Sequence, residues 1–339
     1  MNIKKFKGYF LNLILIWATI LMYKALPYYQ DFIRLETVNI IVIIALSYTS
    51  GGFIYYIFTN SEKVKETKGE LVFRFIKKTI FNLEIYVKSK DKLHRLKIEK
   101  KERVALLFVL VKIFFLPIMI NFVLANFFSV KSQLPRIISA HSSLFNIETF
   151  NLLLYPFILA LIFFFDTLWF AFGYASEAGF LKNKIISVEP TIIGWGVALI
   201  CYPPFNSLVT NYLGWYSNDY ILFSNPTITF IMRILIIIFL GIYVSATFAL
   251  GTKCSNLTNR GIITRGPYSI IRHPAYISKN LAWWMTLIPI LSWQAVLGMM
   301  CWSLIYHFRS LTEEKHLKKD PDYIEYCKKV RYKYIPGIY

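Results

Sequence analysis

The sequence predicts an all-α fold, a multi-pass membrane helical bundle with seven or eight membrane elements. Hydrophobic residues make up 56% of the 339 positions, and the mean hydropathy is +0.48. A soluble domain could not bury so much apolar surface. Apolar runs recur at the length of about 20 residues that about 30 Å of hydrocarbon requires. Lysine and arginine gather in alternate connections between these runs, as the positive-inside rule expects of a membrane protein.

Six of the runs are long enough to cross a bilayer once. The first is rich in aromatic residues and is not followed by the small residues of a cleavage site. We therefore expect it to remain as an anchor and not to be a signal peptide. The six runs cover residues 8–26, 37–58, 104–128, 150–175, 190–213 and 228–250.

A seventh run, 281–306, is predicted to form a tight helical hairpin. It is too short for two ordinary spans, and a single span would carry a tail with eight basic residues to the outside. The segment Ile288-Pro289-Ile290 offers a break in the middle. Two short or tilted arms joined there would keep both ends in the cytoplasm and would bring the 252–280 loop close to the tail.

The distribution of basic residues predicts the topology. The amino terminus, the segments 60–103 and 176–189, and everything from 251 onward hold 32 of the 38 lysines and arginines, so both termini are expected in the cytoplasm. The net charge of +19 thus reflects membrane topology and not a nucleic-acid surface. The lysine- and isoleucine-rich composition favours a bacterial inner membrane over an endomembrane.

Several common kinds of site are excluded by spacing. The four cysteines are scattered without a CxxC pair, and the five histidines show no paired spacing, so neither a disulfide framework nor a metal site is expected. The sequence also lacks a glycine-rich phosphate loop and a nucleophile elbow. It carries no signal for an oligomeric state.

Two features outside the carboxyl-terminal third each leave two interpretations open. Segment 60–103 combines 14 basic with 7 acidic residues. Its apolar residues recur near helical spacing, which fits an interfacial amphipathic helix, although a solvated loop near anionic headgroups is favoured. Asp166 lies in the middle of a predicted span, where a carboxyl group is expensive. It is expected either to pair structurally or to face a substrate cavity.

The segment RGPYSIIRHPAY, residues 265–276, concentrates polar groups between two hydrophobic runs. Gly266 and Pro267 predict a turn-rich loop, and residues 269–273 are expected to form a short helical turn that Pro274 stops. Arg272 and His273 would then offer donors suited to a carboxylate or another anionic group. The alternative is that the arginines and tyrosines only anchor the membrane interface.

The tail segment HFRSLTEEKHL places Arg309 and Glu313 four residues apart, with Glu314 beside them. On a helix that continues the last apolar arm, this face points to the same corner as Arg272 and His273. Such a pair is usually a surface pair worth a few tenths of a kcal/mol. Beside a loop that bears cations and no acids, however, a carboxylate could hold a cationic ligand.

These motifs, in this order, resemble the isoprenylcysteine carboxyl methyltransferase family. GPYSIIRHPAY, the hydrophobic hairpin, RSLTEEKHL, YIEYCKKV and IPGIY carry the resemblance over about residues 230–339. The wider group also includes phospholipid methyltransferases. The resemblance divides the chain into an N-terminal transmembrane region, 1–228, and a catalytic core, 229–339. It implies an S-adenosylmethionine-dependent membrane methyltransferase whose cytoplasmic cofactor pocket is not a Rossmann domain.

The resemblance also implies roles for individual residues. Glu313 would hold the amino end of the methionine, and Arg309 would be the catalytic residue that orients the acceptor. The acceptor is expected to be a lipophilic molecule from the bilayer, so membrane lipids are the expected partners and nucleic acid is not. The implied cofactor-binding residues are Arg260, Gly261, Ile262, Ile263, Tyr268, Arg272, His273, Pro274, Ala275, Tyr276, Glu313 and Glu314.

A carboxylate or another lipid headgroup is the expected acceptor, because a carboxylate needs a cation to orient it but no general base. An amine would need a proton acceptor, and none is apparent in the sequence. The family usually has glycine where Ser278 stands, followed here by Lys279, which alters the expected pocket shape. Two alternatives are an NADPH-dependent reductase similar to sterol reductases and a non-catalytic membrane scaffold.

Overall fold

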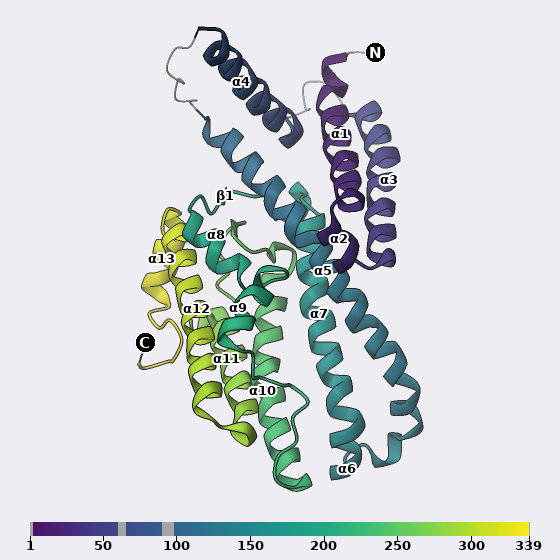
Figure 1. Ribbon diagram of the computed structural model, residues 1–339, viewed down its shortest axis with the longest axis vertical. Coiled ribbons are helices and arrows are strands. Elements are labelled where there is room, and N and C mark those ends of the chain that lie inside the picture. Colours follow the sequence, from purple (N-terminus) through teal and green to yellow (C-terminus); the bar gives the residue numbers. More distant parts are fainter. Residues whose placement is uncertain (1–2, 60–65, 90–97, 339) are drawn as a thin grey trace. The chain divides into compact units, whose positions relative to one another are not determined.

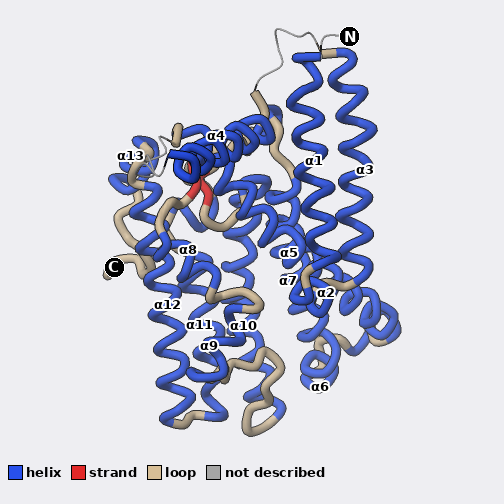
Figure 2. Tube along the Cα trace, turned by 45° about the horizontal axis from the view of Figure 1, so that its top comes forward, coloured by secondary structure: helices blue, strands red, loops and turns tan. Residues whose placement is uncertain are grey.

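The computed structural model describes residues 3–59, 66–89 and 98–338 (Figure 1). Within these ranges the chain is helical apart from loops and one pair of two-residue strands (Figure 2). The strands, β1 (Ser187–Val188) and β2 (Thr258–Asn259), pair antiparallel with Ser187 opposite Asn259. Five of the described helical segments are long and apolar enough to cross a membrane: Phe6–Ala25, Leu35–Phe58, Lys100–Ser139, Ile147–Ala175 and Pro226–Lys253.

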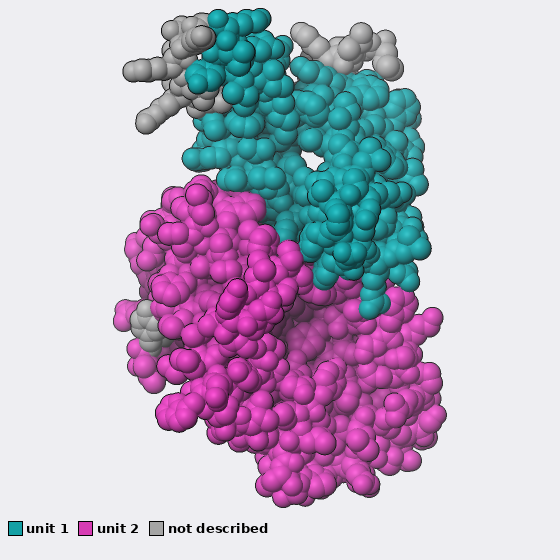
Figure 3. All heavy atoms as spheres, in the orientation of Figure 1, with its two compact units in different colours: residues 1–117 teal, residues 118–339 magenta. Residues whose placement is uncertain are grey.

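The chain forms two compact units, Met1–Pro117 and Ile118–Tyr339, which Figure 3 colours separately. The predicted division at 228/229 concerns where the methyltransferase-like core begins, and it stays a prediction. Short helical segments also occur among the described residues, including α2 (Pro27–Phe32), η2 (His141–Ser143), α6 (Ile147–Thr149), η3 (Phe150–Leu154), η4 (Gly179–Leu181), η5 (Gly251–Lys253) and α13 (Pro321–Lys329).

The first unit contains α1 (Ile3–Ala25), α3 (Leu35–Phe58), α4 (Lys68–Ser89) and the first part of α5 (Lys100–Ser139). Helix α1 packs against α3 and α4. Its contact with α3 is aromatic, since Phe6, Tyr9 and Tyr56 are buried together. A hydrogen bond from the Tyr9 hydroxyl to the carbonyl of Thr49, at 2.5 Å, links the same two helices.

Helix α4 confirms the helical interpretation of part of segment 60–103, whose residues 60–65 and 90–97 lie outside the described ranges. Thr67 and Glu70 form a reciprocal capping box at its start. The Glu70 amide donates to the Thr67 hydroxyl at 3.2 Å, and the Thr67 amide donates to the Glu70 carboxylate at 2.8 Å. Leu71 and Val72 are buried against Ala105, and the apolar side chains toward the other end are exposed. The membrane-surface role of this helix stays a prediction.

The second unit is a bundle of α7 (Tyr155–Ala175), α10 (Pro226–Leu250), α11 (Pro274–Leu287) and α12 (Trp293–Leu317), with the last part of α5. Helix α10 packs against both α7 and α11, and α11 packs against α12. The core between α7, α10 and α11 is apolar, because each helix presents large side chains at helical spacing. Its fully buried members are Tyr155, Leu159, Leu240 and Ala282.

The predicted span 190–213 is wrong. This stretch forms two short helices, α8 (Ile192–Leu199) and α9 (Phe205–Leu213), neither long enough to cross a bilayer. Pro203 and Pro204 separate them, because proline has no amide hydrogen for a helix and clashes with the preceding turn. Hydropathy alone did not reveal this break, and the count of seven or eight membrane elements stays a prediction.

The predicted hairpin in 281–306 has the expected break. Helix α11 ends at Leu287, the short turn η7 (Ile288–Ile290) follows, and α12 begins at Trp293. The Ser292 hydroxyl caps α12 by accepting from the Ala295 amide at 3.2 Å. The expected helical turn over 269–273 is not present. The turn is η6 (Gly266–Ser269), and Pro274 begins α11, since proline is well suited to the first position of a helix.

Candidate functional site

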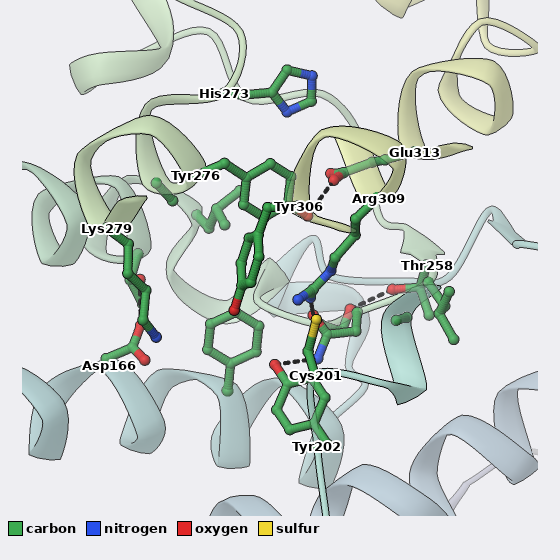
Figure 4. Close-up of a pocket in the computed structure, with 18 of the residues that line it drawn as sticks. Asp166, Cys201, Tyr202, Thr258, His273, Tyr276, Lys279, Tyr306, Arg309 and Glu313 are labelled. Carbon is green, nitrogen blue, oxygen red and sulfur yellow. Dashed lines mark hydrogen bonds between the residues drawn. The ribbon is translucent and has the colours of Figure 1, made fainter. Parts of the chain in front are cut away.

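The second unit contains a cavity of about 410 Å³, within the range of about 300–1,000 Å³ typical of small-molecule sites. Side chains from α5, α7, α8, α10, α11 and α12 and from the loop 255–258 line it. Figure 4 shows that its polar residues come from helices far apart in the sequence. The cavity therefore combines parts of the chain that precede and follow residue 228.

The RHPAY segment is held at the cavity by the tail of the chain. The backbone amides of Arg272 and His273 donate to the carbonyls of Tyr332 and Lys333, each at 3.0 Å. His273 precedes the first turn of α11, and its ring stacks on Tyr276 with centroids 5.4 Å apart. The tail thus fixes the loop, and the first turn of α11 presents its aromatic face to the cavity.

Two adjacent glutamates of α12 have different surroundings. Glu314 is 5% exposed, and its carboxylate lies 3.0 Å from His273 Nε2, 3.2 Å from Arg272 Nη1 and 3.6 Å from Lys333 Nζ. Burial alone would raise the pKa of Glu314, but the hydrogen bond with His273 and the nearby charges of Lys333 and Arg272 lower this pKa to about 2. Glu314 is therefore an internal counterion and does not line the cavity.

Glu313 lies on the cavity wall. Its carboxylate accepts a hydrogen bond of 2.7 Å from the Tyr276 hydroxyl, and the side chain is otherwise exposed. One turn earlier on α12, the Arg309 guanidinium donates to the Asn256 side chain at 2.5 Å. Among the described residues, no carboxylate lies within ion-pair distance of Arg309. Its guanidinium instead lies 5.4–5.8 Å from the centroids of three tyrosine rings, those of Tyr202, Tyr276 and Tyr306 (Figure 4).

A second polar group on the cavity wall comes from α7, α10 and α11. Asp166 is buried and accepts hydrogen bonds from the hydroxyls of Tyr243, at 2.5 Å, and Thr247, at 2.6 Å. Lys279 extends toward Asp166 in Figure 4, and its ammonium lies 3.5 Å from the Tyr243 hydroxyl. The structural pairing expected of Asp166 is therefore confirmed. Asp166 also lines the cavity, and its role toward a substrate stays a prediction.

A third group surrounds His316 near the strand pair. Its Nε2 lies 2.9 Å from the Ser187 hydroxyl, and its Nδ1 lies 3.8 Å from the Glu189 carboxylate. The other oxygen of Glu189 accepts from the backbone and hydroxyl of Thr191. Burial lowers the pKa of His316, which favours a neutral imidazole.

Of the thirteen site residues predicted from the sequence, seven line the cavity and six do not. The residues that line it are Tyr268, Arg272, His273, Ala275, Tyr276, Arg309 and Glu313. The predicted residues that do not line it are Arg260, Gly261, Ile262, Ile263, Pro274 and Glu314.

Local contacts explain why residues 260–263 do not line the cavity. The Arg260 side chain is buried and donates to the backbone carbonyls of Ser176 and Asn183, at 3.4 and 3.1 Å. Ile262 packs in the cluster formed by Tyr323, Tyr326 and Val330 and does not line the cavity. The loop residues that line the cavity lie a few positions earlier: Ser255, Asn256, Leu257 and Thr258.

Sequence reasoning missed several polar lining residues. His316 follows Arg309 by seven positions and Glu313 by three, so helical spacing was a signal for it. Lys279 stood out only as a departure from the family pattern. Glu189, Tyr202 and Asn256 carry no local motif and are found only through the tertiary structure. Among the described residues no cluster of potential metal ligands occurs.

The family model of the phospholipid methyltransferases matches residues 228–320. The match confirms the family resemblance. It covers α10, the RHPAY segment, the hairpin and α12, and so includes Arg272, Arg309 and Glu313. No curated protein and no solved structure matches the chain. Together with the apolar helices, the match supports a membrane protein of the methyltransferase type.

Proposed function

We propose that this protein is an integral-membrane methyltransferase that transfers a methyl group from S-adenosylmethionine to a lipophilic acceptor. The observation that carries this proposal is a single cavity lined both by the RHPAY segment and by Arg309 and Glu313 of α12. All of these residues lie in the segment that matches the phospholipid methyltransferases. The cavity is proposed to open to the cytoplasm, and residues 1–228 are proposed to form a transmembrane region whose later helices contribute to the cavity wall.

The residues present fit S-adenosylmethionine. The Nε atom of Arg272 is buried without a hydrogen-bond partner, and it can donate to the cofactor carboxylate. Glu313, with one hydrogen bond from Tyr276, can accept from the cofactor ammonium group. Tyr268, Tyr276 and Tyr306 supply ring faces, which attract a positively charged sulfur. The volume of about 410 Å³ suits a ligand of this size.

The chemistry that we propose requires little from the protein beyond alignment. When bound, S-adenosylmethionine supplies an activated methyl group on a sulfonium. Glu313 and Arg272 would fix one end of the cofactor, and Arg309 would orient the acceptor for in-line attack. The rings of Tyr202, Tyr276 and Tyr306 around Arg309 exclude water, which strengthens the attraction between its guanidinium and an anionic acceptor.

The proposal of an anionic acceptor, such as a carboxylate, rests only on the positive charge of Arg309. The sequence also disfavoured an amine acceptor because no proton acceptor was apparent. This argument does not hold, because Asp166, Glu189 and His316 line the cavity. Arg309 is the stronger argument, since its guanidinium has no carboxylate partner among the described residues and extends between aromatic rings (Figure 4). A charge in such a place favours a ligand of opposite sign.

Titration of the purified protein with S-adenosylmethionine and, separately, with NADPH tests the proposal. We expect saturable binding of S-adenosylmethionine and none of NADPH. Binding of NADPH instead would identify a reductase, and binding of neither would indicate a scaffold. Incubation with a total lipid extract and methyl-labelled S-adenosylmethionine should then label a lipid, whose isolation identifies the acceptor.

A further inference from the structure

Lys279 has no ion-pair partner among the described residues, although it lies on the wall of the cavity. Its ammonium has one long hydrogen-bond contact, 3.5 Å to the Tyr243 hydroxyl. Tyr243 donates its own proton to Asp166 at 2.5 Å, so the hydroxyl stands between the ammonium and the carboxylate. An ammonium group has three donors, so Lys279 keeps donor capacity for a ligand in the cavity.

The surroundings of Lys279 hold its side chain in place. The ammonium lies 4.7 Å from the ring centroid of Tyr243, 5.4 Å from that of Trp283 and 5.9 Å from that of Phe163. Aromatic faces attract cations, and the negative charge of Asp166 lies beyond the Tyr243 hydroxyl. These contacts keep the side chain in place, and Figure 4 shows it directed toward Asp166.

Lys279 and Arg309 are two cations that line one cavity from neighbouring helices. Lys279 comes from α11 and Arg309 from α12, and neither makes an ion pair among the described residues. Arg272, the third cation of the cavity wall, differs from them because it is paired with Glu314 at 3.2 Å. Cations that make no direct ion pair are costly in an apolar setting, and Asp166 reaches Lys279 only across the Tyr243 hydroxyl, so a ligand with negative charge would stabilise both cations.

We propose that Lys279 and Arg309 together form a binding site for an oxyanion, a carboxylate or a phosphate, on the headgroup of the lipid acceptor. Lys279 is then a specificity-determining residue, and Asp166 is a positioning residue that acts on it through Tyr243. The identification of the bound lipid as the methyl acceptor rests on the proposed function, whereas the anion-binding site itself does not. The apolar cavity wall formed by Met119, Phe122, Phe163 and Phe170 would receive the first part of the lipid chain.

Binding of three single-chain lipids to the full-length protein in a neutral detergent tests the assignment. The probes are radiolabelled oleate, which carries a carboxylate, 1-oleoyl lysophosphatidate, which carries a phosphate, and oleyl alcohol, which is uncharged. We expect at least one anionic probe to bind about tenfold more tightly than the alcohol, a difference of about 1.4 kcal/mol. The probe that shows the preference identifies the kind of oxyanion.

Three variants test whether Lys279 is responsible for the preference for an anionic probe over the alcohol. Lys279→Met should reduce it about tenfold, Lys279→Arg should retain most of it, and Tyr243→Phe should reduce it in part, because the hydroxyl between Lys279 and Asp166 is lost. Lys315→Met is the matched control, since Lys315 is an exposed lysine of α12 that does not line the cavity. Thermal unfolding of each variant verifies that it is folded.

The proposal fails if the wild type shows no preference for either anion, or if Lys279→Met binds both anions as tightly as the wild type does. It also fails if Lys279→Met loses affinity for S-adenosylmethionine to the same extent, because Lys279 would then belong to the cofactor end. A wild-type protein that prefers anionic lipids but binds no S-adenosylmethionine would refute the proposed function and leave the anion site standing.

Discussion

The Nε2 atom of His273 lies 3.0 Å from the Oε1 atom of Glu314, and this contact joins the start of α11 to the end of α12. Both residues are buried, at 6% and 5% exposure. Because Glu314 is turned inward by this contact, its neighbour Glu313 is directed to the cavity, where it meets Tyr276. Glu314 is therefore a structural residue, Glu313 keeps the ligand-binding role that we propose for it, and mutations can separate the two.

Replacement of Glu314 by glutamine should destabilise the protein. The change removes the negative charge that faces buried Lys333 and half-buried Arg272, and removal of one partner from a buried ion pair typically costs about 3–5 kcal/mol. A fall in the midpoint of thermal unfolding measures it. Glu313→Gln is the matched control and should change stability by less than about 0.5 kcal/mol, because Glu313 is exposed.

Stability should fall in acid through Glu314. Its pKa is about 2 in the folded protein, below the ordinary glutamate value, so the stabilisation is complete above about pH 4.5 and is lost as the pH falls toward 2. Thermal unfolding between pH 5 and 2.5 measures this loss. Glu314→Gln should lack this component, and an identical acid dependence in both proteins would contradict the prediction.

Glu313→Gln should weaken S-adenosylmethionine binding at least tenfold, because the amide cannot balance the charge of the cofactor ammonium group; a tenfold loss is about 1.4 kcal/mol. Equilibrium binding of labelled S-adenosylmethionine measures the change. Lys315→Met, on the same helix but away from the cavity, should bind like the wild type. Equal affinity of Glu313→Gln and the wild type would refute the role of Glu313.

Arg309→Ala should leave S-adenosylmethionine affinity within about twofold and lower turnover about 100-fold, the size of effect seen when one preorganised charge is removed from an active site. Methyl transfer to the labelled lipid and cofactor binding are measured on the same preparation. Arg309→Lys should recover part of the activity, since it restores the charge but not the planar guanidinium. Parallel losses of binding and turnover would place Arg309 at the cofactor instead.

Gly173→Ala should destabilise the second unit by about 1–3 kcal/mol, the usual cost of forcing an extra carbon into a packed interior. A β-carbon at Gly173 of α7 would lie 1.9 Å from the carbonyl oxygen of Cys254, which begins the loop on the cavity wall. Gly241→Ala is the matched control, because nothing lies within 4 Å of its added carbon. Thermal unfolding should separate the two variants clearly.

The sequence predicted those parts of the structure that follow from local patterns. The long helices follow from apolar runs of sufficient length, and the break before Trp293 follows from Pro289 and Ser292. The meeting of His273, Tyr276 and Glu313 followed from two motifs at the ends of one hairpin. Each of these inferences needs only helical periodicity and the chemistry of a few residue types.

The parts that could not be predicted depend on tertiary packing. The stretch 190–213 is apolar enough for a span, yet two prolines divide it, and α8 with the turn that follows it forms part of the cavity wall. The choice between Glu313 and Glu314 as the buried member depends on Lys333, which the tail supplies. The inward direction of Arg260 depends on carbonyls from a loop more than 70 positions earlier in the chain.

The cavity wall extends beyond the segment 228–320, since α5, α7 and α8 contribute to it. A minimal version made from the last third alone would lack Asp166, Glu189 and Tyr202. If the proposed function holds, relatives that share only the matched segment could keep the residues proposed for the methyl donor while replacing α5, α7 and α8. Engineered changes of acceptor preference would then be directed at those three helices.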